Sequence, residues 1–265
     1  MSGEIEVPLG GAVTEAVRVG MTVRRPAASQ DAAVAALLVH LERAGFTGAP
    51  RYLGRDEGGR SVLTWIDGWS PAPTQEQLIS VDAVRSVGAL LRQYHDAVAG
   101  YRPGAAGAVF LDGPRVLSAG QVVCHGDIAP RNTVFVAGTP VAFIDWDGAW
   151  ISDPLWDVGH AIWQFAPLDP DRRLRATGWH DIPDRLSRAT ALADGYGLSQ
   201  AARAELPARI APMIRQCAAG VEARVRAGEP AFIRLADAGV IHDMEEAARY
   251  AAVQEPALLE RLLAG

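Results

Sequence analysis

The chain carries, near its middle, the segment Val122-Val123-Cys124-His125-Gly126-Asp127-Ile128-Ala129-Pro130-Arg131-Asn132-Thr133-Val134-Phe135, followed by Val141-Ala142-Phe143-Ile144-Asp145-Trp146-Asp147. Apolar runs rich in Val, Ile and Phe flank Gly138-Thr139-Pro140, whose residue types favour a turn. Short apolar runs on either side of a turn are typical of a β-hairpin. The pattern predicts strands near 133–137 and 141–144.

Polar side chains stand at both ends of this hairpin. Asp127 and Asn132 precede it, and Asp145 and Asp147 follow it. Because a hairpin returns its two ends to the same place, we expect these groups to converge. One carboxylate can then accept a proton while an amide oxygen and a second carboxylate bind a cation, and such oxygen ligands suit Mg²⁺. For Asp147 two interpretations stand, a further metal ligand or a cap of the following turn.

The spacing of these residues has a known counterpart. A His-x-Asp followed five residues later by Asn is the catalytic-loop pattern of phosphoryl-transfer kinases. His125-Gly126-Asp127 with Asn132 and Ile144-Asp145 resembles the aminoglycoside phosphotransferase and choline kinase superfamily. The segment from Ser152 to Gly159 resembles the Asp-Pro-x-x-Asp-Leu-Ala segment of the same family. An isolated Asp-Gly or Gly-Asp is commonly only a turn, but the ordered series of matches favours the kinase interpretation.

This resemblance implies a fold of the α+β class, a two-lobed protein-kinase-like fold. Its small N-terminal lobe is expected to contain antiparallel strands and one helix, over residues 1–68, and to bind the nucleotide. The hinge is expected at about 64–70. Residues 71–265 are expected to form a mainly helical lobe for catalysis and substrate binding.

The resemblance also assigns roles to individual residues. Asp127 is the expected catalytic residue, which orients the acceptor hydroxyl and accepts its proton. Asn132 and Asp145 are the expected metal ligands for Mg²⁺ between the phosphates. Asp157 is expected to hold the catalytic loop through hydrogen bonds to its backbone, and His125 is expected to pack and order that loop.

The small lobe departs from the family pattern. Gly10 and Gly11 form a weak candidate for the loop that covers the phosphates, and no Lys stands on the strand where the family places its phosphate-binding Lys. The resemblance puts Arg25 or Arg24 there, with Arg25 preferred, since arginine binds phosphate oxygens in a bidentate manner. The alternative is a solvated basic strand end.

A helix is predicted from a cap at Asp31 to about Ala44, with an apolar face. The family usually places a Glu early in this helix to orient the Lys, and only Asp31 is acidic there. A second, longer helix is predicted to begin at Thr74. His95, near its end, is interpreted as a packing residue.

The segment at Thr64, Trp65 and Ile66 resembles the hinge of the family, where backbone groups bind the adenine edge. The carbonyl of Thr64 and the amide of Ile66 are the candidates, with Trp65 between them. An ordinary edge strand is the alternative.

Composition excludes several classes of protein. The 265 residues are 49% hydrophobic and carry a net charge of −6, which does not suggest a nucleic-acid binder. Cys124 and Cys217 are the only cysteines, so a disulfide framework is excluded. The first residues do not read as a signal peptide and no apolar run is long enough to span a membrane. We therefore expect a cytoplasmic protein without a membrane partner.

The expected reaction is transfer of the γ-phosphate of ATP or GTP, with Mg²⁺, to a hydroxyl of a small molecule. The substrates of the family make an aminoglycoside or another antibiotic-like compound the leading expectation, and an acidic chain tolerates a cationic acceptor. Asp243, Glu245 and Glu246 are either ammonium contacts or part of a solvated helix face. One rival is a nucleotide-binding, pseudokinase-like scaffold without catalysis. Another is a metal-dependent hydrolase using His125 and Asp127.

Overall fold

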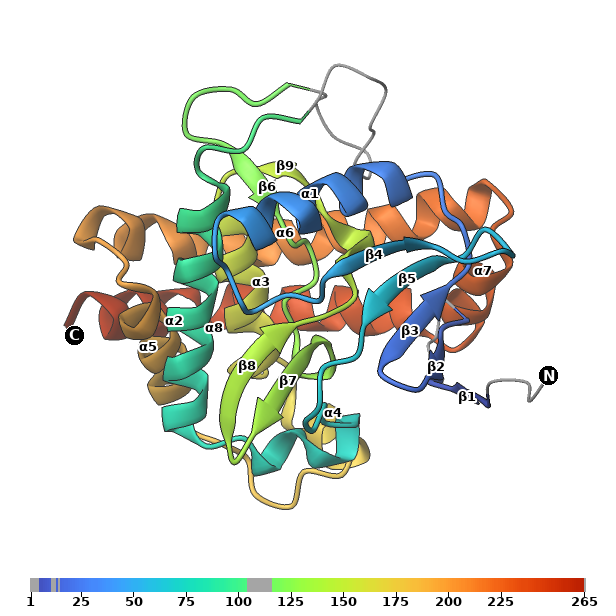
Figure 1. The fold of residues 1–265 in the computed structure, drawn as a ribbon. Coiled ribbons are helices and arrows are strands. Elements are labelled where there is room, and N and C mark those ends of the chain that lie inside the picture. Colours follow the sequence, from blue (N-terminus) through green and yellow to red (C-terminus); the bar gives the residue numbers. More distant parts are fainter. Residues whose placement is uncertain (1–4, 11–12, 14, 104–115, 265) are drawn as a thin grey trace.

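A computed structural model describes residues 5–10, 13, 15–103 and 116–264. An antiparallel sheet and one helix form the N-terminal part, and helices dominate the rest (Figure 1). The sheet has the strand order β1-β2-β3-β5-β4. Its elements are β1 (Glu6–Pro8), β2 (Val17–Val19), β3 (Thr22–Arg25), α1 (Asp31–Arg43), β4 (Tyr52–Arg55) and β5 (Ser61–Thr64).

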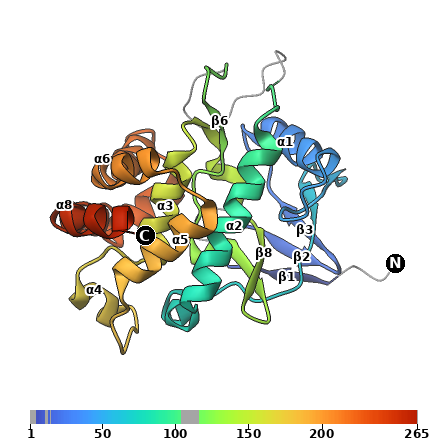
Figure 2. The same ribbon diagram turned by 90° about the vertical axis from the view of Figure 1, so that its left-hand side faces the viewer.

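The C-terminal part is built around two short strand pairs and a set of helices. Seen from the side, α2 and β8 lie between the small sheet with α1 at one end and the helices α6 and α8 at the other (Figure 2). The two-lobed, mixed fold predicted from the sequence is confirmed. The elements are η1 (Pro73–Leu78), α2 (Val81–Val98), β6 (Val122–Cys124), η2 (Pro130–Asn132), β7 (Thr133–Val136), β8 (Thr139–Phe143), η3 (Trp146–Gly148), β9 (Trp150–Ser152), α3 (Leu155–Phe165), α4 (Asp171–Ala176), α5 (Arg185–Tyr196), α6 (Gln200–Arg226), α7 (Pro230–Asp237) and α8 (Val240–Ala264).

Helix α1 buries its apolar face against the rest of the protein, as its sequence pattern predicts, but it is not capped as expected. Gln30 occupies the N-cap position, and its side chain makes no capping hydrogen bond. Asp31 is instead the first helical residue. Its carboxylate accepts a hydrogen bond from the Ser61 hydroxyl at 3.0 Å and pairs with Arg55 at 3.4 Å. The predicted cap is wrong because these partners on β4 and β5 hold the carboxylate.

The long helix predicted from Thr74 is interrupted. Residues Pro73–Leu78 form a 3₁₀ helix, and the backbone at Ile79 and Ser80 is extended. The Ser80 hydroxyl then caps α2 by accepting from the Ala83 amide at 3.1 Å. Leu78, the last residue of the 3₁₀ helix, is 68% exposed. Ser at an N-cap satisfies an amide that the first helical turn leaves unpaired, so the helix starts there.

The predicted hairpin is present, with a turn one residue earlier than expected. Ala137 and Gly138, both with positive φ, form a two-residue loop, the geometry that matches the twist of a hairpin. Pro140 lies inside β8, opposite Phe135, where the register of the strands shifts. Proline cannot donate a ladder hydrogen bond and is tolerated at such irregularities.

The connection between the two parts of the chain is attached to this hairpin. The Trp69 amide donates to the Phe135 carbonyl at 2.8 Å, and the Phe135 amide donates to the Trp69 carbonyl at 2.8 Å. The indole of Trp69 also packs on the Phe135 ring. Residues 66–68 therefore enter the helical part beside the catalytic hairpin. Among the described residues, no helix has both the length and the apolar character needed to cross a membrane.

Candidate active site

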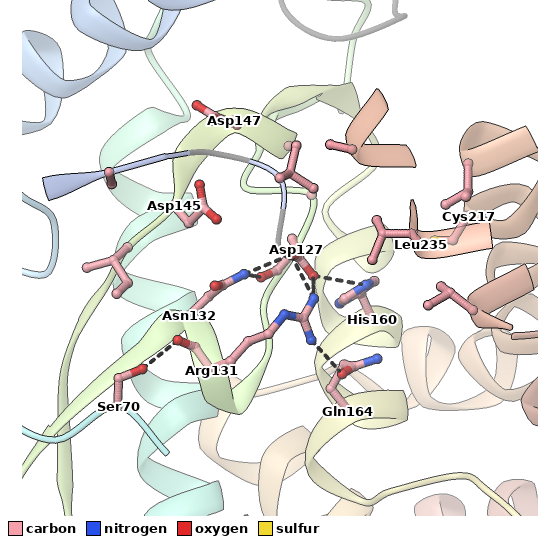
Figure 3. A pocket seen from close by; sticks show the side chains of 18 of the residues that line it. Ser70, Asp127, Arg131, Asn132, Asp145, Asp147, His160, Gln164, Cys217 and Leu235 are labelled. Atoms are coloured by element: carbon pink, nitrogen blue, oxygen red, sulfur yellow. Dashed lines mark hydrogen bonds and ion pairs between the residues drawn. The ribbon is translucent and has the colours of Figure 1, made fainter. Parts of the chain in front are cut away.

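A large cavity of about 1990 Å³ lies between the sheet and the helical part. Its walls include β3 and residues 64–66 from the first part and the catalytic loop, α3, α6 and α7 from the second. Figure 3 shows Asp127 at its centre, with Asn132 and Asp145 on one side and His160, Cys217 and Leu235 on the other. This volume exceeds that of a usual single-ligand pocket, so two ligands fit.

The backbone of the catalytic loop is fixed by a close approach at Gly126. This residue has φ +83°, and a Cβ there would lie 2.0 Å from the carbonyl oxygen of Gly148. Any other residue would clash with the backbone of the loop that carries Asp145 and Asp147. The Gly of His-Gly-Asp is therefore required by packing.

Asp157 fixes the same loop through hydrogen bonds from its backbone amides, as the family resemblance implied. One carboxylate oxygen accepts from the His125 amide at 2.7 Å, and the other accepts from the Gly126 amide at 2.9 Å. Burial alone would raise the pKa of Asp157, but hydrogen bonding to His95 and neighbouring positive charge hold the pKa below its ordinary value. The buried His95 ring also contacts the Tyr196 hydroxyl at 2.8 Å. The expected packing role of His95 is confirmed.

The His125 ring connects the loop at Asp127 to the end of the hairpin at Ile144. Its Nε2 donates to the Ile144 carbonyl at 3.1 Å, and its Nδ1 accepts from the Asp127 amide at 3.3 Å. The ring is fully buried beside Phe143 and Trp146, and burial lowers its pKa. A neutral ring bonded at both nitrogens orders the loop and does not face the cavity.

Asp127 is held by three neighbours. Arg131 donates to both carboxylate oxygens, at 2.6 and 2.8 Å, and the Asn132 side-chain amide donates to one of them at 2.8 Å. His160 Nε2 lies 3.6 Å away on the opposite side. Burial raises the pKa of Asp127, but Arg131 and the two histidines outweigh burial and keep the pKa below its ordinary value. The group is a carboxylate that accepts hydrogen bonds readily.

The four polar groups at the ends of the hairpin converge as predicted. The Ile144 amide donates to the Asn132 carbonyl at 2.9 Å, which brings the two ends together. Burial first, and then the charges of Asp147 and Asp127, raise the pKa of Asp145 despite the nearby Arg25. A carboxylate whose pKa is raised by neighbouring carboxylates is a group that a bound cation stabilises.

The donor atoms fit Mg²⁺. Since the nitrogen of the Asn132 amide donates to Asp127, its oxygen is the atom left to accept or coordinate. Asp145 follows β8 with φ +63°, an uncommon left-handed conformation that Asp adopts more readily than most residues. An amide oxygen and a carboxylate are the hard ligands that Mg²⁺ binds, with phosphate oxygens and water completing the set.

Asp147 is not a cap. Asp145 occupies the N-cap position of η3, without a side-chain cap, and Asp147 lies one residue inside this turn. The Asp147 carboxylate instead pairs with the Arg25 guanidinium, which also lies 3.2 Å from Asp145. The cap interpretation is wrong because this basic side chain from the sheet reaches the carboxylate.

The structure distinguishes the two arginines at the end of β3. Arg25 lines the cavity and pairs with Asp145 and Asp147, whereas Arg24 pairs with Asp56 at 3.4 Å and does not line it. Consecutive side chains of a strand point to opposite faces, so only one of the two can face the site. Arg24 is therefore ruled out as a cavity residue. Burial lowers the pKa of Arg25, but Asp147 and Asp145 raise it above its ordinary value.

The predicted adenine-binding segment lines the opposite end of the cavity. Thr64, Trp65 and Ile66 all contribute to the wall. The Trp65 amide is taken by the Met21 carbonyl at 2.8 Å, while no hydrogen bond between described backbone groups uses the Ile66 amide. Gly10 also lines the cavity, with φ +66°, and Gly11 lies outside the described residues.

Several site residues escaped the sequence interpretation. Arg131 stands inside the quoted motif, four residues after Asp127, and this spacing was a usable signal. His160 lies on α3, where its Nδ1 donates to the Ile128 carbonyl at 3.1 Å. Glu76 faces Arg131 from η1, and burial raises its pKa to about 7. Nothing in the local sequence marks His160 or Glu76.

Comparison with known proteins identifies the family to which the chain is similar. A family model described as "Phosphotransferase enzyme family" matches residues 105–192. A trifolitoxin immunity protein of Rhizobium leguminosarum bv. trifolii is 35% identical over 200 residues, which cover 73% of this chain and 74% of that protein.

Three solved structures share the fold. A choline/ethanolamine kinase family protein from Mesorhizobium loti has a TM-score of 0.55 and 18% identity, covering 100% of this chain and 95% of the other. The streptomycin–ATP–APH(2″)-IIa ternary complex has a TM-score of 0.53 and 12% identity, covering 81% and 84%. The macrolide 2′-phosphotransferase MphH from Brachybacterium faecium has a TM-score of 0.51 and 17% identity, covering 94% and 93%. This chain belongs to the phosphotransferase family of the aminoglycoside phosphotransferase and choline kinase superfamily.

Proposed function

We propose that this protein transfers the γ-phosphate of a nucleoside triphosphate, with Mg²⁺, to a hydroxyl group of an antibiotic-like small molecule. The observation that carries the proposal is the arrangement around Asp127. Its carboxylate lies beside Asn132, in a cavity that Asp145 and Arg25 share. Phosphoryl transfer depends mainly on positioning and charge neutralisation, and this arrangement offers both.

In this proposal Asp127 acts chiefly by orientation. Its pKa is lowered, so it is a weak base at neutral pH but a good acceptor for the hydrogen of a hydroxyl group. In a loose transition state the leaving bond is largely broken before the hydroxyl loses its proton, so a strong base is not needed. Asp127 holds the hydroxyl oxygen in line with the phosphorus and takes the proton late. Arg131, whose ion pair with Asp127 is broken or shared when the acceptor binds, then faces the transferring phosphoryl group.

Asn132 and Asp145 would hold Mg²⁺, which supplies neutralisation of the phosphate charge when bound. Arg25 takes the place of the phosphate-binding Lys, and Asp31 stands near it. The two interact electrostatically, although Asp31 is hydrogen-bonded to Ser61. The Thr64 carbonyl and the Ile66 amide would bind the base, beside Trp65, and Gly10 and Gly11 would lie near the phosphates. Residues 1–68 would thus form the nucleotide lobe, a hinge would lie at 64–70, and residues 71–265 would form the catalytic lobe.

The names of the related proteins support an antibiotic or toxin as the acceptor. The 35% identical relative is named an immunity protein against trifolitoxin, and two of the structures above are an aminoglycoside and a macrolide phosphotransferase. An aminoglycoside or another antibiotic-like compound is accordingly the acceptor class proposed. A cytoplasmic location fits a protein that intercepts such a compound where nucleoside triphosphates are abundant.

The test is nucleotide consumption by the purified protein with ATP and with GTP, in Mg²⁺ and in excess chelator, across a panel of hydroxyl compounds. The expected result is a product heavier by one phosphate group, formed only with Mg²⁺ and one or more acceptors. Nucleotide binding without any phosphorylated product would overturn the proposal in favour of the pseudokinase-like scaffold. Phosphate release from an added phosphate ester, with neither acceptor nor nucleotide present, would instead indicate a hydrolase.

A further inference from the structure

The cavity continues beyond Asp127 into a region that the nucleotide does not need. Its wall comes from β9, α3, α4 and the segment after it, α6, α7 and the start of α8. Aromatic and aliphatic side chains make up most of it, and they are Trp150, Trp156, Trp163, Leu174, Trp179, Cys217, Val221, Phe232, Leu235, Val240 and Met244. We refer to this set as the acceptor wall. On the proposed function, it surrounds the hydroxyl-bearing substrate.

The carboxylates beside the acceptor wall are already paired with arginines of the same protein. Arg173 Nε lies 3.0 Å from Asp169, and the same guanidinium pairs with Asp243. Arg224 lies 3.1 Å from Glu229. A cationic ligand would have to come close to these arginines in order to reach the carboxylates, and their charges would repel it.

Two of the acidic groups in this region are also reluctant to ionise. Burial raises the pKa of Glu76 to about 7, so about half of this group is protonated at neutral pH. Burial raises the pKa of Asp169 as well, although Arg173 opposes the rise. With Arg173, Arg224 and Arg234 all lining the cavity, four carboxyl groups face three fixed positive charges, and the region carries little negative charge overall.

An aromatic wall can also bind one quaternary ammonium group without any carboxylate. Such a cage needs several rings converging on one small space. Here the rings come from separate elements of a wide cavity, and Trp150 packs edge-on against Trp156, with centroids 4.7 Å apart. Rings that contact each other in a broad wall fit the body of a large apolar ligand better than one small cation.

We infer that the acceptor is a hydroxyl compound with a predominantly apolar body and little net positive charge, rather than a polycationic aminoglycoside. This inference rests on the proposed function and narrows the class of compound that serves as its acceptor. An apolar body buries surface against the acceptor wall, which is favourable in proportion to the area removed from water. A hydroxyl of that body then reaches Asp127 at the floor of the cavity. A macrolide and a short apolar peptide bearing a hydroxyl share this chemistry.

Binding can be measured apart from turnover. Tryptophan fluorescence is titrated with a macrolide, a Thr-containing apolar peptide, kanamycin and choline, in the presence of Mg²⁺ and a non-hydrolysable ATP analogue. We expect the macrolide or the peptide to bind at least tenfold more tightly than kanamycin or choline, and whichever does so identifies the source. Equal or tighter binding of kanamycin or choline would overturn the inference, as would no binding of either the macrolide or the apolar peptide up to 1 mM. Tight binding of one of these two without phosphorylation would refute the proposed kinase activity alone.

A variant sharpens the test. Arg173→Met releases Asp169 and Asp243 into the cavity, and we expect it to improve kanamycin binding at least fivefold. Arg172→Met is the matched control, since the exposed Arg172 pairs with Glu246 and does not line the cavity. Leu235→Glu is a second variant that adds a carboxylate to α7 without removing a buried ion pair, and the same gain is expected. No gain in either variant would contradict the inference.

Discussion

The two sides of Asp127 are built in different ways. On the proposed nucleotide side, Asp145, Asp147 and Arg25 form a compact group of charges joined by ion pairs, and Asn132 is hydrogen-bonded to Asp127. On the acceptor side, apolar rings and aliphatic groups from several separated parts of the chain form a broad wall. On the proposed function, the polar groups with fixed partners would position a phosphate and a metal, whereas the apolar wall would select a ligand by shape and burial. One side would then provide the chemistry and the other would choose the substrate.

The difference explains what the sequence could predict. The nucleotide side comes mostly from residues 125–147, where a hairpin turns a short spacing pattern into a spatial cluster. Asp127, Asn132, Asp145 and the support from Asp157 were therefore predictable. The acceptor wall depends on how α3, α6 and α7 pack, and no local pattern marks its members. Individual charges in that region, such as Asp243, could not be assigned because their partner Arg173 lies far away in the sequence.

The largest effect is expected from removing the carboxylate of Asp127, which lies between the two sides. We expect Asp127→Asn to lower kcat by about 10³-fold, because a neutral amide orients the acceptor hydroxyl less firmly and cannot take up the proton that this hydroxyl loses late in the reaction. Asp96→Asn is the matched control, since Asp96 is exposed on α2 and pairs only with Arg92 at the surface. Steady-state kinetics with the identified acceptor measures both. Turnover within tenfold of the wild type would contradict the role of Asp127.

A second substitution tests the hydrogen bonds by which Asp157 fixes the loop at His125 and Gly126. We expect Asp157→Asn to lower the free energy of unfolding by about 3 kcal/mol, because a buried carboxylate that receives two backbone amides and contacts His95 loses its charge and one acceptor. Urea unfolding of this variant beside Asp96→Asn gives the difference. A loss below about 1 kcal/mol would show that the loop is held mainly by the glycine contact at Gly126 and Gly148.

A third change compares neighbours on one strand. We expect Arg25→Met to lower kcat/KM for the nucleotide about 100-fold, since one buried cation at the phosphates is lost. Arg24→Met, on the other face of β3, should change it less than threefold. Equal effects of the two variants would mean that Arg25 contributes to the sheet and not to the phosphates.

The smallest expected effect is on the pH dependence of the free energy of unfolding. His125 and His160 have pKa values lowered by burial, so below about pH 6.5 the unfolded chain takes up their protons and the folded protein does not. These groups lower stability as pH falls. Glu76, with a pKa raised to about 7, acts in the opposite direction between about pH 7 and 4.5, because the folded protein holds its proton.

We therefore expect Glu76→Gln to lose stability more steeply than the wild type between pH 7 and 5.5, by about 1.4 kcal/mol per pH unit at most. Urea unfolding at several pH values measures the slopes. An unchanged slope would show that Glu76 is ionised in the folded protein, which would also weaken the case for an acceptor of low charge.

Where sequence patterns failed in the fold, a specific partner from another segment intervened. Ser61 and Arg55 hold Asp31, which the sequence placed as a cap. Arg25 holds Asp147, also interpreted as a cap. The spacing of apolar residues predicted one continuous helix from Thr74 through Ile79. In the structure a 3₁₀ helix ends at Leu78, and α2 begins after its N-cap at Ser80. Local propensity predicts where an element forms, and it does not reveal which distant side chain will compete for its polar groups.

The pair of hydrogen bonds between Trp69 and Phe135 fixes the place where the first part of the chain joins the second. Gly68, the residue before Trp69, has φ +153°, and a Cβ there would lie 2.5 Å from the Val134 side chain and 2.7 Å from the Phe135 carbonyl oxygen. Only a residue without a side chain lets the chain run this close to the hairpin. Any side chain at Gly68 would therefore push this connection away from the hairpin, and with it the sheet that carries Arg25.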